Sequence, residues 1–510
     1  MNPSTSAYPL ALAAYLFTLG GCPAPEPTTP EPPTVADSPP EREVTEPVDR
    51  SKLPSPTAVA PWKLGAVQTW KMDNGIHVWL LEQTHAPLVS LQVLFPHGRA
   101  SDPAKMAGLT ALTVDLMNEG AGSRSALELS EAGQRLATDY GDAVGLDSTA
   151  FYINTLAENI APSLELLADV LRRPRFPPAE FKRRKAQRLA QIEARTADPG
   201  TMHALAENEA LFGIGYGGLP TSGTTATLRP ISLDLVKRHY EALIQPEGAT
   251  IVVVGAVDRA ALTSQLNRVF GDWRGAPKGN VVGPKLELNE PGSTARIFVV
   301  DFPGAPQSVL SVARRVPGLK ADDYFASRVF NWSLGGAFSS RLNLNLREDK
   351  GYTYGARAGF DRHHKAGSYS LKARVKADTT RPSLDEMFKE VRDMVGGRPL
   401  SEVEYKKAVD GLLLGFPGRF ETMNGTAGQL GFVASAGWDA AWLGKWPDRI
   451  RGVSIEEARA SAQANLSRPE DFVVVVAGDW SSLAESFSDL NREVVMCGKE
   501  PVFLCPSGNP

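Results

Sequence analysis

The sequence predicts an α+β fold in which one domain occurs twice. The first observation is that QPEGATIVVVGAVD at 245–258 returns as RPEDFVVVVAGDW at 468–480. Pro246 and Pro469 are 223 residues apart, and the Glu and the Gly of each segment keep that offset. The second observation is that β-branched strands alternate with amphipathic helices in both halves. Repeated units at this spacing indicate a duplicated domain.

A second pair of strands supports the duplication. The segment VSLQVLFPHG at 89–98 has a counterpart in SVLSVARRVPG at 308–318, and each precedes a long helix-prone region. Residues 276–293 are rich in Gly and Pro and are typical of a linker. We therefore expect an N-terminal domain over 63–275, a C-terminal domain over 294–485 and a tail over 486–510.

In the N-terminal half, apolar runs at 76–83 and 88–95 predict two strands that pair around the turn at 84–87. An outer strand of the sheet is expected near 143–152. Apolar spacing, bounding prolines and a charged stretch predict helices at 107–118, 162–174 and 178–197.

The C-terminal half repeats this arrangement. Strands are expected at 296–301 and 307–314, followed by a helix near 321–333. A turn and further strands extend to about residue 377, and two helices follow at 382–395 and 401–416.

Charge and composition exclude several classes of protein. The chain has 54 Lys and Arg against 58 Asp and Glu, a net charge of −4, so no nucleic-acid partner is expected. The one long apolar run lies near the start and is too short to span a bilayer, which excludes a polytopic membrane protein. Three cysteines make neither a disulfide scaffold nor a Cys-rich zinc protein.

Residues 1–21 are typical of a signal peptide, and Leu19-Gly20-Gly21-Cys22 resembles a bacterial lipobox. In that signal the Cys is acylated, which predicts a lipid anchor at Cys22. The alternative is an ordinary signal peptide with an incidental Cys, because the first residues lack Lys and Arg. Residues 22–62 are rich in Pro and predict a disordered tether. We expect a lipid-anchored bacterial envelope protein, at the outer membrane and facing the periplasm.

The motifs resemble the M16 (pitrilysin/insulinase) metallopeptidase family over about residues 65–485. In the N-terminal half the matching strings are NGIHVWLLE, GLTALTVDLMNEGAG, LELLADVLRRPRF and LPTSGTTATLRPISLDLVKRHYEALIQPEGATIVVVGAVD. In the C-terminal half they are LGGAFSSRLNLNLREDKGYTYGA and VVVVAGDW. The resemblance implies two M16-type domains, each an antiparallel-rich sheet with helices packed on one face.

Active members of this family carry HxxEH on a helix. Two His one turn apart hold Zn²⁺, the Glu activates the bound water, and a Glu about 76 residues later completes the site. This chain has Ala111, Val114, Asp115 and Gln191 at those positions. Ala and Val have no donor atom, neutral Gln is a poor ligand, and one carboxylate does not make a zinc site. The resemblance implies no metal, no cofactor and no catalytic residue of its own in this chain.

The family's C-terminal domain supplies an Arg and a Tyr, seven residues apart, that reach the substrate. The string LREDKGYTY places Arg347 and Tyr354 at these positions. The Arg fork can bind a peptide carbonyl or carboxylate, and the Tyr hydroxyl can donate to an oxyanion. The alternative is that Arg347 is a solvated residue at a helix end and Tyr354 an aromatic residue in the core.

No other motif in the sequence supplies catalytic chemistry. There is no GxSxG and no HxxEH, and the adjacent His363 and His364 would point to opposite faces of a strand. Cys497 and Cys505 are eight residues apart, and in an oxidising compartment they predict a local structural disulfide.

Small two-domain members of the family often work as heterodimers in which one subunit has lost HxxEH. The resemblance therefore implies a subunit that binds no zinc, a partner subunit that carries HxxEH and the zinc, and unfolded peptide as substrate. The peptide would add as a β-strand to an exposed sheet edge. The alternative is a non-catalytic peptide-binding or scaffold lipoprotein that retains the fold.

Overall fold

A computed structural model of the chain describes residues 62–275 and 296–499 together with residue 505. The expected signal peptide, Cys22, the tether before Trp62 and the linker at 276–293 lie outside the described residues. All described residues belong to one compact unit, Ala60–Pro510. Within the described ranges, no helix has both the length and the hydropathy needed to cross a bilayer.

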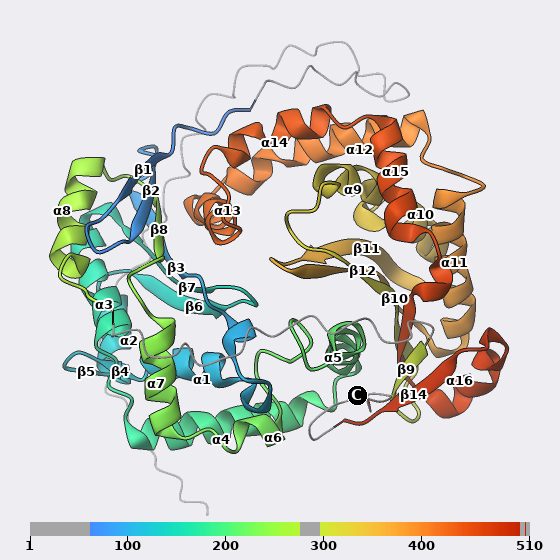
Figure 1. Cartoon of the computed structure of the whole chain (residues 1–510), viewed down its shortest axis with the longest axis horizontal. Helices are drawn as coiled ribbons and strands as arrows, with labels where there is room; N and C mark the ends of the chain where they lie inside the picture. The colour runs from blue at the N-terminus through green and yellow to red at the C-terminus, as the bar shows by residue number, and fades with distance from the viewer. Residues whose placement is uncertain (1–61, 276–295, 500–504, 506–510) are drawn as a thin grey trace, which may run out of the picture. The chain divides into compact units, whose positions relative to one another are not determined.

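The first domain contains a six-stranded sheet with the order β1-β2-β8-β3-β7-β6 (Figure 1). Strand β8 runs parallel to β2, and the other neighbours are antiparallel. The strands are β1 Gln68–Lys71, β2 His77–Glu82, β3 Leu88–Phe95, β6 Asp139–Val144, β7 Thr149–Leu156 and β8 Thr250–Gly255, beside a small ladder of β4 Gly120–Ala121 and β5 Arg124–Ser125. The helices are α1 Leu109–Met117, α2 Ala126–Arg135, α3 Ile160–Arg172, α4 Pro178–Arg195, α5 Pro199–Phe212, α6 Thr225–Leu228, α7 Leu233–Leu243 and α8 Arg259–Phe270.

The second domain repeats this sheet. Its order is β11-β12-β10-β13-β9-β14, so β13 takes the place of β8 and β11 that of the edge strand β6. The strands are β9 Arg296–Asp301, β10 Gln307–Pro317, β11 Thr353–Arg362, β12 Ala366–Lys376, β13 Val473–Gly478 and β14 Glu493–Cys497. The helices are α9 Tyr324–Asn331, α10 Arg341–Asn343, α11 Thr380–Val395, α12 Glu402–Gly415, α13 Met423–Ser435, α14 Trp442–Arg451, α15 Ile455–Leu466 and α16 Trp480–Phe487, with π-helical segments η4 Trp332–Gly336 and η5 Leu344–Asp349. The predicted duplication and α+β class are confirmed.

Three details of the sequence prediction are wrong. Strands β2 and β3 do not pair with each other, because the largely buried β8 lies between them and pairs with both. The outer strand of the first sheet is β6 at 139–144, and the predicted segment 143–152 spans its end, a turn and part of the inner strand β7. The second domain continues beyond residue 485, because β14 in the predicted tail pairs in parallel with β9.

Each domain lends one helix to the sheet of the other. Helix α5 of the first domain packs on β9, β10 and β13 of the second sheet. Helix α13 of the second domain packs on β3 and β8 of the first sheet. Met202, Leu211 and Phe212 of α5 are buried in one cluster with Val300, Val475 and other second-sheet residues. Burial of this apolar surface stabilises both sheets at once.

Cys497 and Cys505 form a disulfide at the end of β14. Both cysteines are buried in the cluster that α5 makes with the second sheet. The backbone N–H of Cys505 also donates to the Glu209 carboxylate of α5, at 3.1 Å. The disulfide therefore holds the last described residue against the helix donated by the first domain.

Polar side chains also join α5 to the second sheet. The buried Glu207 carboxylate pairs with Lys372 of β12 at 2.8 Å. His203 is 2% exposed beside this pair and hydrogen-bonds the backbone of Val475 in β13. Burial lowers the pKa of His203 to about 4, with Glu207 opposing the shift and Lys372 adding to it.

We expect acid to weaken this helix contact. The unfolded chain binds a proton at His203 below about pH 6.5, whereas the folded chain does so only near pH 4. The contribution of neutral His203 to the free energy of unfolding is therefore fully present above about pH 6.5. It falls by about 3 kcal/mol as the pH drops to about 4. His203→Gln should flatten this slope in urea unfolding measured between pH 7 and 4.5. The matched control is His85→Gln, at an exposed position, which should leave the slope unchanged. An equal slope in wild type and His203→Gln would contradict the prediction.

Candidate functional site

Helix α1, which carries three of the four expected zinc-site positions, begins at a buried carboxylate. Asp102 accepts hydrogen bonds from the backbone N–H of Gly108 and Thr110, at 2.9 and 2.8 Å, and from the Thr110 hydroxyl. The Thr110 hydroxyl lies 2.8 Å from Nε2 of His239 in α7. Burial raises the pKa of Asp102 to about 6 and lowers that of His239 to about 4. This buried cluster fixes the start of α1.

The four positions that correspond to the family's zinc site lie on the contacting helices α1 and α4. Ala111 is 5% exposed and Val114 is fully buried, so both belong to the apolar packing of the first domain. Asp115 is partly exposed, and Gln191 lies exposed on α4. The structure therefore brings α1 and α4 together but offers one charged donor at these positions.

The carboxylate of Asp115 is paired with an arginine of α4. The Arg188 guanidinium forms an ion pair with Asp115 and also contacts the carbonyl of Ala111. One turn earlier, Arg183 and Arg184 both pair with the buried Glu119, which follows α1. Three guanidinium groups of α4 thus pair with the two carboxylates of Asp115 and Glu119.

These residues do not fit a zinc ion. A tetrahedral site needs three or four donors of the His, Cys or carboxylate type. Here two positions carry no donor atom, Gln191 is a neutral amide, and Asp115 is bound to a cation. Elsewhere in the described ranges, no three His, Cys, Asp or Glu side chains converge as a metal site. We derive no chemical step through zinc in this chain.

The edge strand β6 lies beside α1. Asn118, at the end of α1, donates to the Asp142 carboxylate of β6 at 2.9 Å. Burial raises the pKa of Asp142, and the nearby Asp115 carboxylate raises it further. The strand pairs with β7 on one side only, so its other side presents unpaired backbone groups at the sheet edge.

Arg347 and Tyr354 lie at the corresponding place in the second domain. Arg347 belongs to the π-helical segment η5, and Tyr354 lies near the start of the edge strand β11. Gly351, with a φ of +65°, turns the chain between them. Tyr354 is 93% exposed, so the alternative of a core aromatic is wrong.

The Arg347 guanidinium lies over the ring of Phe338, with 4.5 Å to the ring centroid, and its Nε is 3.3 Å from Glu348. Phe338 and Leu344 are exposed at 61% and 42%. Phe338 was not among the site residues predicted from the sequence, although GGAFSSRL places this large apolar residue among small ones before the Arg/Tyr string. The Arg/Tyr segment is thus flanked by uncovered apolar side chains.

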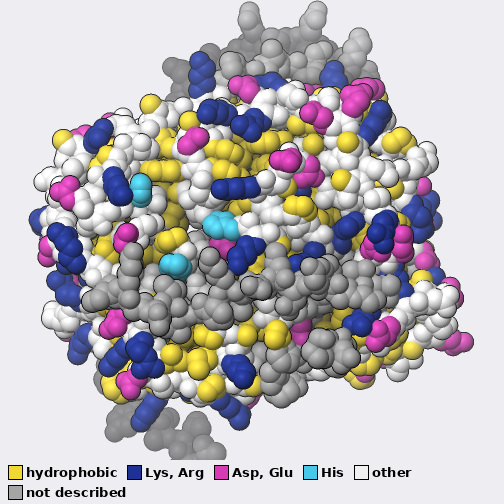
Figure 2. Space-filling view, in the orientation of Figure 1, with side chains coloured by type: hydrophobic (Ala, Val, Ile, Leu, Met, Phe, Trp, Pro, Cys, Tyr) yellow, Lys and Arg dark blue, Asp and Glu magenta, His cyan; other side chains and the backbone are white. Residues whose placement is uncertain are grey.

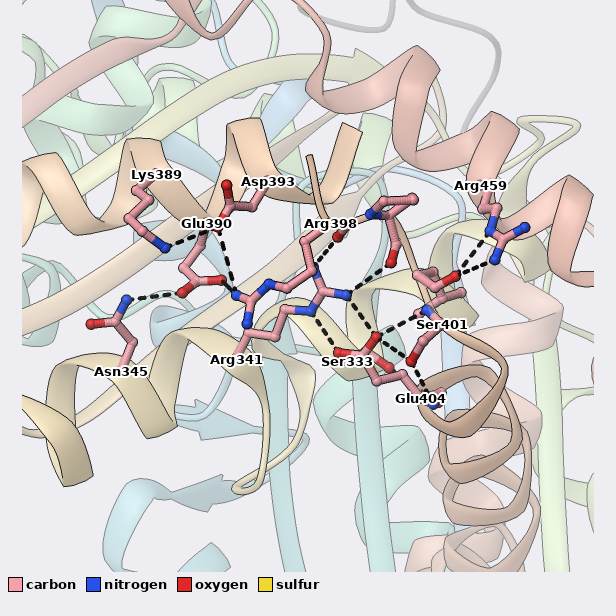
Figure 3. A network of polar contacts seen from close by, with 12 residues as sticks. Ser333, Arg341, Asn345, Lys389, Glu390, Asp393, Arg398, Ser401, Glu404 and Arg459 are labelled. Atoms are coloured by element: carbon pink, nitrogen blue, oxygen red, sulfur yellow. Dashed lines mark hydrogen bonds and ion pairs between the residues drawn. The ribbon is translucent and has the colours of Figure 1, made fainter. Parts of the chain in front are cut away.

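A polar network holds this segment in place (Figure 3). Arg341, which is 7% exposed, forms two 2.6 Å hydrogen bonds to the Glu404 carboxylate of α12. Asn345 of η5 donates to Glu386 and Glu390 of α11, each at 2.8 Å, and Arg398 pairs with Glu390. Desolvation raises the pKa of Glu404, but hydrogen bonds from Arg341 and Ser401 bring it down to about 2. The carboxylate is therefore charged, and the support of η5 persists, at neutral pH.

The comparisons with known proteins match both halves of the chain. A sequence profile described as Insulinase (Peptidase family M16) matches residues 78–219, and one described as Peptidase M16 inactive domain matches residues 230–412. The chain belongs to the M16 peptidase family. The positions of HxxEH and of the Arg/Tyr pair therefore fall inside matched regions.

Relatives of this M16 protein are described as uncharacterized zinc proteases. One from Mycobacterium tuberculosis is 24% identical over 73% of this chain and 84% of its own length. One from Streptomyces coelicolor is 23% identical over 74% of this chain and 82% of its own. The solved M16 inactive domain from Pseudomonas fluorescens is 24% identical with a TM-score of 0.74, over 81% of this chain and 98% of that one. A Helicobacter pylori protease, 16% identical with a TM-score of 0.73, covers 81% of this chain and all of its own. These likenesses to solved structures show the fold.

The Asp115–Arg188 pair should contribute to stability. Its side chains are 31% and 14% exposed, so solvent screens the pair only in part. We expect a double-mutant cycle of Asp115→Ala and Arg188→Ala, followed by urea unfolding, to give a coupling of about 1–2 kcal/mol.

The exposed pair Glu131–Arg135 of α2 is the matched control for this cycle. Its coupling should stay below about 0.5 kcal/mol, since surface pairs are largely screened. A coupling near zero for Asp115–Arg188 would contradict the stabilising role of this ion pair.

Proposed function

We propose that this M16 protein is the non-zinc-binding subunit of a heterodimeric M16-type metallopeptidase that cleaves unfolded peptides. A partner subunit with HxxEH would hold the zinc, and this chain would supply Arg347 and Tyr354 to the bound peptide. The observation that supports this most is that the expected zinc positions carry no donor set, whereas Tyr354 is 93% exposed and the nearby Arg347 side chain is 35% exposed.

The chemistry of the two side chains suits this role. Arg347 has a planar fork that can hold a peptide carbonyl, and Phe338 supports one face of that fork. Tyr354 makes no hydrogen bond within the described part of the chain, so its hydroxyl is available to an oxyanion formed at the partner's zinc. The peptide backbone would pair with an exposed edge strand, which gives affinity with little sequence specificity.

The remaining expectations belong to the same proposal. Acylation at Cys22 would anchor the subunit to a bacterial envelope membrane, with the Pro-rich segment as a tether. The purified chain alone should contain no stoichiometric zinc and should not cleave peptides. A scaffold protein without a peptidase partner is the competing account, and it predicts that Arg347 and Tyr354 can change freely.

The test is reconstitution with the HxxEH-bearing M16 chain from the same genome. Arg347→Ala and Tyr354→Phe should each lower kcat/KM for an unfolded peptide by roughly 100-fold, because each removes a donor used in the transition state. The heterodimer should still form, as measured by size-exclusion chromatography with light scattering.

Arg135→Ala is the control, because Arg135 is an exposed arginine of α2 that pairs only with Glu131 within the described residues. It should leave kcat/KM unchanged. Full activity in a heterodimer that carries both Arg347→Ala and Tyr354→Phe would refute the proposal and favour the scaffold account.

A further inference from the structure

The second domain contains a cavity of about 430 Å³ that the proposed function does not use. It lies between α9, the last residues of β11, the end of α12, α13 and the short 3-10 helix η7 Pro417–Phe420. Figure 2 shows basic side chains set among hydrophobic ones on one face of the molecule. None of Phe338, Arg347 and Tyr354 lines this cavity.

Two arginines without a carboxylate partner line the cavity. Arg328 of α9 donates to the Tyr324 hydroxyl at 2.6 Å and lies over the same ring. Arg419 of η7 lies over the rings of Phe416 and Trp446. Within the described part of the chain neither guanidinium makes an ion pair. Desolvation lowers the pKa of Arg419, and the positive charge of Arg328 lowers it further, so the two charges lie close enough to repel.

A third arginine in the wall is buried and only partly satisfied. The Arg362 side chain is 4% exposed, and its Nη2 donates to Asp323 at 3.0 Å. Its Nε and Nη1 are buried with no hydrogen-bond partner among the described residues. Buried donors of this kind cost free energy unless a ligand or water satisfies them. The one carboxylate in the lining, Asp361, is 76% exposed and turned to His363 at 3.4 Å.

The rest of the wall is apolar and aromatic. Tyr324, Phe360, Phe432 and Leu412 line the cavity beside the arginines. Gly359 of the edge strand β11 also lines it, and a Cβ at this position would meet nothing within 4 Å. A ligand backbone can therefore approach the strand here. The wall combines arginine side chains with apolar and aromatic ones, and inorganic phosphate alone would leave the aromatic side chains uncovered.

We propose that this cavity binds the C-terminal carboxylate of a peptide whose last side chain is apolar. The carboxylate lies on the forks of Arg328 and Arg419, and the last side chain packs between Phe360 and Phe432. This inference rests on the proposed function in one respect, that the ligands of this chain are peptides. It adds that the chain binds the free C-terminus of a peptide as well as the peptide backbone.

The test measures binding of one peptide in two forms to the full chain. A fluorescein-labelled peptide that ends in Leu-Phe is prepared as the free acid and as the C-terminal amide, and binding is followed by fluorescence anisotropy. The acid should bind at least about 10-fold more tightly than the amide, since a charge-assisted fork is worth more than one neutral hydrogen bond.

Variants assign the difference to this cavity. Two variants should each lower the affinity for the free acid to that for the amide. Arg419→Gln changes a surface position, and Arg328→Lys keeps the charge but loses the planar guanidinium. Arg449→Gln is the matched control, because Arg449 lies over Phe325 of the same aromatic cluster but does not line the cavity. It should keep the full acid preference.

Two outcomes overturn the inference. Equal binding of acid and amide would show that the cavity does not read the carboxylate. Inorganic phosphate that competes as well as N-acetylphenylalanine would assign the cavity to a free oxyanion instead of a peptide end. Neither outcome touches the proposed function, whose failure would appear as unchanged cleavage in the Arg347 and Tyr354 variants.

Discussion

The exchange of helices α5 and α13 is the contact on which the rest of the structure depends. A sheet buries its apolar face only where another layer covers it. Here the face that each domain leaves uncovered is closed by a helix that the other domain contributes. Neither sheet is therefore fully covered without the helix that the other domain contributes. The disulfide, the buried Glu207–Lys372 pair and His203 all lie at the α5 half of this exchange.

This constraint explains how the chain can keep its fold without a donor set at the positions where the family resemblance places zinc ligands. The zinc positions lie on α1 and α4, outside the exchanged helices. A guanidinium from α4 carries the positive charge that meets Asp115, and the buried Glu119 is held by two more. The helix contact thus remains neutralised without a metal. In the second domain the Arg341–Glu404 pair supports the segment that carries Arg347.

The sequence predicted the parts of the fold that depend on local pattern. The Pro, Glu and Gly offset between β8 and β13 revealed the duplication, and most helices and strands lie where apolar spacing placed them. The pairing of β2 with β8 was missed, because β8 begins 168 residues after β2 ends and no local signal joins strands that far apart. β14 was assigned to a tail, since an isolated run of five residues carries no signal for the distant strand β9 with which it pairs.

The sequence likewise predicted the positions of the site residues but not their surroundings. Family motifs located Ala111, Val114, Asp115, Gln191, Arg347 and Tyr354, but not their environment. Arg188 lies one turn from Gln191 on the same helix face, so its pairing with Asp115 could have been expected. The exposure of Tyr354 depends on β11 being an edge strand, and the convergence of Arg328, Arg362 and Arg419 depends on three distant segments. Both arise only from tertiary packing.

The central claim is that this chain supplies one half of a zinc peptidase whose metal belongs to another subunit. It is tested most directly by purifying the tagged chain from its own membranes, identifying its partner by mass spectrometry and measuring zinc in the purified material. The account predicts one HxxEH-bearing M16 partner per chain and about one zinc per pair. Recovery of this chain alone with about one zinc per chain would contradict it.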